Sequence, residues 1–258
     1  MDKPQAFTYI YKSMNQSFHS KLFVQAFRYS MPVLLGYLAI GIAFGLLLVD
    51  AGYPWWFSLV MSLIMYAGAG QYLAVGLFAA GTTLVEAALV QLVVNARHTA
   101  YGFSMLTRFN AAGAFKYYLI FALTDETFAL LSSLPEPQGP RPQGTALDLA
   151  DHTPDERSRF MFLVAVLDQS YWVMGSVIGA VAGSLLPFSM QGIGFALTAL
   201  FVVLMIEQVL RVRQARIFLI AAGVAVLAVF TLPSRISLLA AMALSLALVQ
   251  LLQKRKAR

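Results

Sequence analysis

The run from Phe115 to Leu134, FKYYLIFALTDETFALLSSL, decides the fold class of this chain. It is long and apolar enough for a membrane-spanning helix, yet it places Asp125 and Glu126 near its middle. A charged side chain at the bilayer centre costs roughly 2.5 to 3.5 kcal/mol, so such acids usually line a pathway or pair with cations. The two acids therefore indicate a membrane protein whose function lies within its apolar segments.

The composition supports this class. Hydrophobic residues make up 59% of the 258 residues and charged residues only 12%, whereas about a quarter of a soluble domain is charged. We expect one all-α integral membrane domain. The chain has no cysteine, which excludes disulfides and thiolate metal sites, and no pattern predicts a cofactor, a metal or a nucleic acid partner.

Eight apolar runs, most of about the 20 residues that a bilayer requires, divide the chain. They are Met31–Val49, Trp55–Ala79, Leu84–Met105, Phe115–Leu134, Phe160–Leu186, Gly192–Leu210, Ile217–Leu232 and Ile236–Leu252. We expect about eight transmembrane helices, some of them broken. The seventh run is the shortest, so seven helices is the alternative.

The basic residues predict the orientation, because cytoplasmic loops collect Lys and Arg. Eight spans put fourteen of the 18 Lys and Arg residues on the side of both termini, which is therefore expected to be cytoplasmic. The opposite side receives Arg108, Lys116 and Arg235, and Arg97 lies inside a span.

The runs also suggest a domain plan. Residues 1–30 form a cytoplasmic or interfacial segment, in which apolar residues from Phe7 to Leu22 recur at helical spacing. They predict an amphipathic helix on the membrane surface, with a partly ordered tail as the alternative. Residues 31–252 form a single transmembrane domain with a proline-rich cytoplasmic loop at 135–159, and residues 253–258 form a basic cytoplasmic tail.

Glycines mark two kinds of feature. Those spaced by four residues in the first and fifth runs, including Gly41 with Gly45 and Gly175 with Gly179, predict close helix contact. The stretch from Tyr66 to Tyr72, YAGAGQY, lowers helix propensity in the middle of the second run and predicts a break. An intact helix with small packing residues is the alternative there.

The third run carries more polar residues than lipid contact would permit. One helix face carries Gln91, Asn95 and His98, and the opposite face carries Glu86, Arg97 and Tyr101. Either Arg97 extends to the outer interface, or the helix unwinds near Asn95 and turns both groups inward. His98 alone is more often a structural residue than a proton carrier.

Asp125 and Glu126 differ by about 100° around a helix, so one can face a pathway while the other pairs with Arg97 or caps a break. Thr124 or Asp125 would be the N-cap of a helix that begins there. Asp168 in the fifth run is a further candidate, and its alternative is simple interfacial placement. The candidates for proton coupling are Glu126, His98 and Asp168, because burial favours the neutral carboxyl form.

Several of these motifs, in this order, resemble the AzlC family of branched-chain amino acid transport proteins. They are the stretch from Tyr66 to Gln71; Asn95-Ala96-Arg97-His98 with Tyr101-Gly102 and Ser104; and Leu123-Thr124-Asp125-Glu126 with Phe128-Ala129. The resemblance implies an inner-membrane permease that moves branched-chain amino acids, often outward, with a small AzlD-type membrane partner.

A zwitterionic aliphatic substrate needs a carboxylate site, an ammonium site and an apolar pocket. Arg97 or the break at Gly68 to Gly70 would hold the carboxylate, and Asp125 or Glu126 the ammonium. The expected substrate-binding residues are Gly68, Gly70, Gln71, Asn95, Arg97 and Asp125.

Two other functions use the same residues. A proton or ion channel would need the acids but no amino acid specificity. An intramembrane hydrolase would have only Ser104 and His98 as nucleophile and base, without an orienting third group. No Walker-type sequence is present, so the chain is not expected to hydrolyse ATP.

Overall fold

The computed structural model of the chain describes residues 3–134, 153–185 and 215–232, together with scattered positions between 202 and 248. Side chains are described from residue 21 onward. The chain divides into two compact units, residues 1–71 with 95–189 and residues 72–94 with 190–258. All of the assigned elements in the described ranges are helices, as the composition predicted.

The elements are given in chain order. They are α1 (Lys3–Asp50), α2 (Trp55–Ile64), α3 (Gly68–Ala79), α4 (Leu84–Met105), the 3₁₀ turn η1 (Asn110–Ala112), α5 (Phe115–Phe121), α6 (Asp125–Ser133), α7 (Pro154–Leu185) and α9 (Ala215–Thr231). In the described ranges, Lys21–Asp50 and Pro154–Leu185 are the helices long and apolar enough to cross a membrane.

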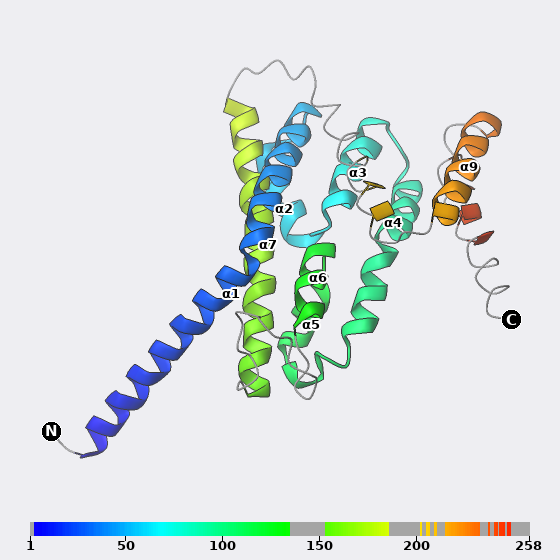
Figure 1. Cartoon of the computed structure of the whole chain (residues 1–258). Helices are drawn as coiled ribbons and strands as arrows, with labels where there is room; N and C mark the ends of the chain where they lie inside the picture. Colours follow the sequence, from blue (N-terminus) through cyan, green and yellow to red (C-terminus); the bar gives the residue numbers. More distant parts are fainter. Residues whose placement is uncertain are drawn as a thin grey trace, which may run out of the picture. The chain divides into compact units, whose positions relative to one another are not determined.

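Helices α1 and α7 lie side by side in the first unit (Figure 1). Their contact is close because glycines face the other helix's backbone. A Cβ atom added at Gly41 would lie 3.0 Å from the Ser176 nitrogen, and one added at Gly175 would lie 2.9 Å from the Leu38 oxygen. The packing role predicted for these glycines is confirmed.

The N-terminal segment is helical and continues without interruption into the first apolar run, since α1 begins at Lys3. The expected location of this segment on the membrane surface stays a prediction.

The second apolar run is broken, as the glycines predicted. Helix α2 ends at Ile64, α3 begins at Gly68, and Tyr66 between them has a left-handed φ of 37°. The chain doubles back at this break, because the Gln71 side chain donates a 3.2 Å hydrogen bond to the Ser62 hydroxyl. On a continuous helix these residues would be about 14 Å apart along the axis.

The fourth run is broken as well, between α5 and α6. Thr124 has extended backbone and its hydroxyl accepts a hydrogen bond from the Thr127 amide, so the expected N-cap is confirmed. Arg108, which precedes α5, donates to the carbonyls of Leu131 and Leu134 at the end of α6, at 3.1 and 2.7 Å. The fourth run therefore begins and ends at the same end of the first unit.

This geometry corrects the predicted topology. The eight-span plan put Arg108 and Lys116 on the side opposite the loop that begins at Pro135, but Arg108 contacts Leu134 and Lys116 bonds Asn110 beside it. Hydropathy alone does not distinguish a 20-residue span from two short helices that turn back. With 7 and 9 residues, α5 and α6 are each too short to cross a core of about 30 Å. The count of eight spans is not confirmed.

Helix α7 begins earlier than the fifth apolar run. The Thr153 amide donates to the Glu156 carboxylate and the Glu156 amide to the Thr153 hydroxyl, a reciprocal cap that starts the helix at Pro154. The final residues of the predicted loop at 135–159 are thus helical. Asp168 lies near the middle of α7 and is fully buried, so the interfacial alternative for it is wrong.

Helix α4 is continuous, so the alternative in which the third run unwinds near Asn95 is wrong. Glu86 caps its start by accepting from Thr83. Helix α9 covers most of the seventh run. The sixth and eighth runs, the loop at 135–152 and the tail at 253–258 lie largely or wholly outside the described residues.

Candidate functional site

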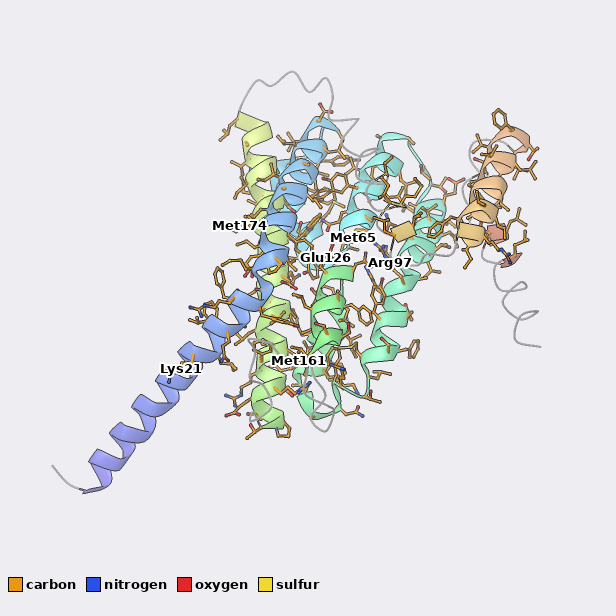
Figure 2. The ribbon with its side chains drawn as sticks, viewed as in Figure 1. Lys21, Met65, Arg97, Glu126, Met161 and Met174 are labelled. Carbon is orange, nitrogen blue, oxygen red and sulfur yellow. The ribbon has the colours of Figure 1, made fainter. Side chains whose placement is uncertain are left out.

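Two neighbouring acids at the start of α6 contact different helices. Asp125 accepts from Arg97 of α4 at 2.8 Å and from the Tyr101 hydroxyl at 2.5 Å. Glu126 accepts from the Tyr37 hydroxyl of α1 at 2.8 Å. Figure 2 labels Arg97 on α4 and Glu126 at the start of α6. The expected divergence of the two acids is confirmed.

The ion pair between Arg97 and Asp125 is only partly covered, with side-chain exposures of 30% and 17%. Arg97 therefore does not extend to the outer interface, because its guanidinium is held by Asp125. The Tyr101 ring stacks on Phe128 with centroids 4.4 Å apart and an interplanar angle of 9°. This stacking fixes the phenol that orients Asp125, so the carboxylate is held by two side chains of α4.

A line of hydrogen bonds leads from Glu126 into the interior. The Tyr37 hydroxyl, bonded to Glu126, lies 2.6 Å from the Thr124 hydroxyl, which lies 3.1 Å from that of Thr127. The Thr127 hydroxyl is hydrogen-bonded to an Asp168 oxygen at 2.8 Å. Glu126 is exposed, whereas Thr127 and Asp168 are fully buried. Two acidic candidates from separate runs are thus joined through three hydroxyl groups.

Gln169 connects the two broken runs. Its amide nitrogen donates to the Ser62 and Leu63 carbonyls at the end of α2, at 3.4 and 3.2 Å. Its oxygen accepts from the Tyr118 hydroxyl of α5 at 2.6 Å. The carbonyls that a helix end leaves unpaired are therefore satisfied from α7.

The break between α2 and α3 is held against α7 by Gln71 and Gly68. The buried Gln71 amide donates to Ser62 and accepts from the Trp172 indole at 2.8 Å. A Cβ atom at Gly68 would lie 3.1 Å from the Trp172 ring, so the backbone approaches the indole closely. Both residues have a clear structural role, and their predicted role in substrate binding stays a prediction.

The remaining candidates are placed less directly. Gly70 lies in the first turn of α3, and Asn95 lies two residues before Arg97 on α4. The His98 ring is 6.0 Å from that of Tyr101 and takes no part in the line from Glu126 to Asp168. The Ser104 hydroxyl donates to the Tyr101 carbonyl, so its proton is not directed at His98.

Most of the residues that connect the acids could not be recognised from the sequence. Tyr37, Thr127, Tyr118 and Gln169 are mildly polar residues within apolar runs, where they read as ordinary packing or capping residues. One pattern in the sequence could have identified Tyr37. It precedes Gly41 and Gly45 by about one and two helical turns and therefore lies on the same helix face. Those glycines face α7, so Tyr37 had to face it too.

Comparison with known proteins identifies relatives of this chain. The family model described as "AzlC protein" matches residues 32–186. A protein of Helicobacter pylori strain 26695, named "Uncharacterized membrane protein", is 42% identical over 188 residues, which cover 73% of this chain and 76% of the relative.

Two further relatives carry more specific names. "Branched-chain amino acid transport protein AzlC" of Bacillus subtilis is 33% identical over 192 residues, 74% of this chain and 70% of the relative. "Inner membrane protein YgaZ" of Escherichia coli K12 is 31% identical over 188 residues, 70% of this chain and 71% of the relative. No solved structure is significantly similar to the chain.

Proposed function

Because the chain belongs to the AzlC family, we propose that it is a membrane permease that transports branched-chain amino acids. Its relative in Bacillus subtilis is named as a transport protein for these substrates. We infer a location in the inner membrane with both termini cytoplasmic, operation in the export direction, and a small AzlD-type membrane partner. The name of the Escherichia coli relative and the distribution of basic residues support the location and orientation.

The ion pair between Arg97 and Asp125 is the observation that carries the proposal. An amino acid brings one carboxylate and one ammonium, and each group matches one member of the pair. When the pair separates, the substrate carboxylate binds Arg97 and the substrate ammonium binds Asp125. Both charges then keep a partner, so the exchange avoids an unpaired charge inside the membrane.

The surroundings of the pair suit this exchange. Both side chains are partly accessible. Asp125 lies in the first turn of α6, where the helix dipole stabilises its negative charge while the pair is open. Phe128 and the ring of Tyr101 offer apolar surface beside the charges.

The proposed protein function is that of a carrier, not of an enzyme. Its experimental signature is saturation, because a carrier exposes a limited number of binding sites. Leucine flux that saturates and is competed by valine would distinguish it from a channel that lets ions pass.

The test uses the full chain in proteoliposomes, with and without the AzlD-type partner, and measures flux of labelled leucine. Arg97→Ala and Asp125→Asn are expected to abolish flux while the protein inserts at normal levels. Arg159→Ala is the matched control, because it breaks the exposed pair with Asp155 at the start of α7 and should leave flux unchanged. Normal flux in both site variants would refute the assignment.

A double variant separates substrate binding from a structural ion pair. Arg97→Gln with Asp125→Asn removes both charges and leaves no unpaired ion. If the pair is only structural, this variant regains stability and transport together. We expect it to be stable and inactive, because it offers neither charge to the zwitterion.

A further inference from the structure

The hydrogen-bonded line between Glu126 and Asp168 has one proton too few when both acids are ionised. The line contains four contacts: Glu126 with Tyr37, Tyr37 with Thr124, Thr124 with Thr127, and Thr127 with Asp168. Each contact between two oxygens needs one hydrogen, and each of the three hydroxyl groups supplies one. Four contacts therefore require a fourth proton, carried by one of the acids.

When both acids are ionised, the contact left without a hydrogen is the shortest of the four, between Tyr37 and Thr124. If Tyr37 donates to Glu126, Thr124 to Thr127 and Thr127 to Asp168, no hydrogen is left between Tyr37 and Thr124. These two oxygens are only 2.6 Å apart, a distance typical of a hydrogen bond. The Thr124 oxygen also accepts from the Thr127 amide, so it can accept one more hydrogen and donate its own.

One added proton satisfies the line in either of two directions. With the proton on Asp168, each hydroxyl donates toward Glu126. With the proton on Glu126, each hydroxyl donates toward Asp168. The two arrangements have the same oxygens in the same contacts and differ only in the position of four hydrogens.

We propose that Glu126 and Asp168 share a single proton and exchange it through Tyr37, Thr124 and Thr127, which makes this line the proton relay of the transporter. In the transfer from Glu126, the carboxyl O–H bond breaks and an O–H bond forms at Tyr37. The hydrogens of Tyr37, Thr124 and Thr127 each move to the next oxygen, and the last forms the O–H bond of Asp168. Four O–H bonds break, four form, and the negative charge moves from Asp168 to Glu126.

The two ends of the relay have different environments. Glu126 is exposed, whereas Asp168 is fully buried and its second oxygen has no hydrogen-bond partner among the residues that the structure describes. In the described part of the chain, no Lys, Arg or His forms an ion pair with Asp168. An unpaired anionic oxygen is more costly to bury than a neutral one. The resting proton is therefore on Asp168, and Glu126 is ionised.

The other titratable groups near the relay are consistent with a proton on Asp168 and an ionised Glu126. Asp168 is approached by Tyr66, Tyr118 and Tyr171, from the α2–α3 break, α5 and α7. These phenols are neutral and bring no positive charge to Asp168. Glu126 is approached by Asp125 and by Arg97, whose charge pairs with Asp125.

The relay rests on the proposed transport function and assigns its coupling ion. Glu126 follows Asp125 directly in the chain, so the proton end of the relay adjoins the proposed ammonium site. A substrate ammonium bound at Asp125 stabilises the ionised form of Glu126 and so holds the proton on Asp168, whereas departure of the substrate removes this stabilisation and lets the proton return to Glu126. Binding of substrate and movement of the proton are thereby linked through charge.

The decisive variant is Thr127→Val, which removes one relay hydroxyl at nearly constant shape and changes no charge. We measure two activities of the full chain with its small partner in proteoliposomes: leucine exchange without a gradient, and leucine movement driven by a pH gradient. Thr127→Val is expected to keep exchange and lose pH-driven movement. Thr127→Ser, which keeps the hydroxyl, should retain both, as should Thr99→Val, a matched change at an exposed position of α4.

The outcomes separate the relay from the transport function. Wild-type exchange with no response to a pH gradient would overturn the relay and leave the transport proposal intact, as would pH-driven movement that Thr127→Val does not affect. If the wild type moves no leucine, the transport proposal fails, and infrared spectroscopy tests the shared proton directly. The carbonyl band of a protonated carboxyl group should then be lost in Asp168→Asn and kept in Glu126→Gln; its absence in the wild type would overturn the relay.

Discussion

The indole Nε1 of Trp172 donates a 2.8 Å hydrogen bond to the side-chain oxygen of Gln71, which ties the start of α3 to the middle of α7. The same amide donates to Ser62 at 3.2 Å and so holds the two sides of the helix break together. Gln71 is completely buried and Trp172 nearly so. The break in the second run is thus a fixed structure, although it contains a residue with a left-handed backbone.

Gln71→Leu is expected to lower the free energy of unfolding by roughly 1 to 3 kcal/mol, because it leaves the buried indole N–H of Trp172 without a partner. Thermal unfolding in detergent, followed by tryptophan fluorescence, measures the effect. Trp56→Phe is the control, since that indole is 51% exposed and should leave the transition unchanged. An unfolding temperature equal to that of the wild type in Gln71→Leu would contradict the role given to the amide.

Gly45→Ala should prevent α1 from packing on α7, because the added Cβ would overlap the backbone at Ser176 and Ala180. We expect loss of folded protein from the membrane, measured by the fraction that remains monodisperse after detergent extraction. Gly36→Ala is the matched control on the same helix, where an added Cβ meets nothing within 4 Å. It should stabilise the helix by up to about 1 kcal/mol.

Single-cysteine labelling tests the course of the fourth run, and the natural chain has no cysteine to interfere. Asn110→Cys and Asp155→Cys should react with a membrane-impermeant thiol reagent from the same side, because the fourth run turns back at Thr124. Asp50→Cys, at the other end of α1, should react from the opposite side. If the reagent labelled Asn110→Cys and Asp50→Cys from the same side of the membrane, the eight-span topology would be correct after all.

Gln169→Leu is expected to loosen both helix breaks at once, because it removes the bonds to the α2 carbonyls and the acceptor for Tyr118. Hydrogen exchange measured by mass spectrometry should rise in α2 and α5 together. Ser170→Ala is the control, since that exposed hydroxyl donates to the Val166 carbonyl of its own helix. Faster exchange in α2 alone would show that Gln169 does not link the two runs.

Much of the site was visible in the sequence because charge and glycine stand out in apolar runs. Asp125, Glu126 and Arg97 stand out because lipid disfavours charged side chains, and the low helix propensity of glycine predicts the break near Gly68. The turn at Thr124 was expected only as a cap. Its consequence, a chain that doubles back, could not be predicted from hydropathy. The hydrogen bond from Arg108 to the Leu134 carbonyl joins residues that are far apart in the sequence, and hydropathy does not report such contacts.

The relay hydroxyls could not be found from the sequence for a related reason. A tyrosine or threonine in a membrane helix is common and satisfies itself by local bonds. What distinguishes Tyr37 and Thr127 is that each bonds an acid on another helix. That relationship depends on the packing of α1, α6 and α7, which local patterns do not specify.

The glycine contact between α1 and α7 also limits how this protein can move. Backbone lies against backbone at Gly41, Gly45, Gly175 and Gly179, so a slide of one helix along the other would drive larger side chains into the positions that glycines now occupy. Helices α1 and α7 therefore move together as one rigid body. A change that opened the site to one side of the membrane and then to the other would therefore keep α1 and α7 together as one body.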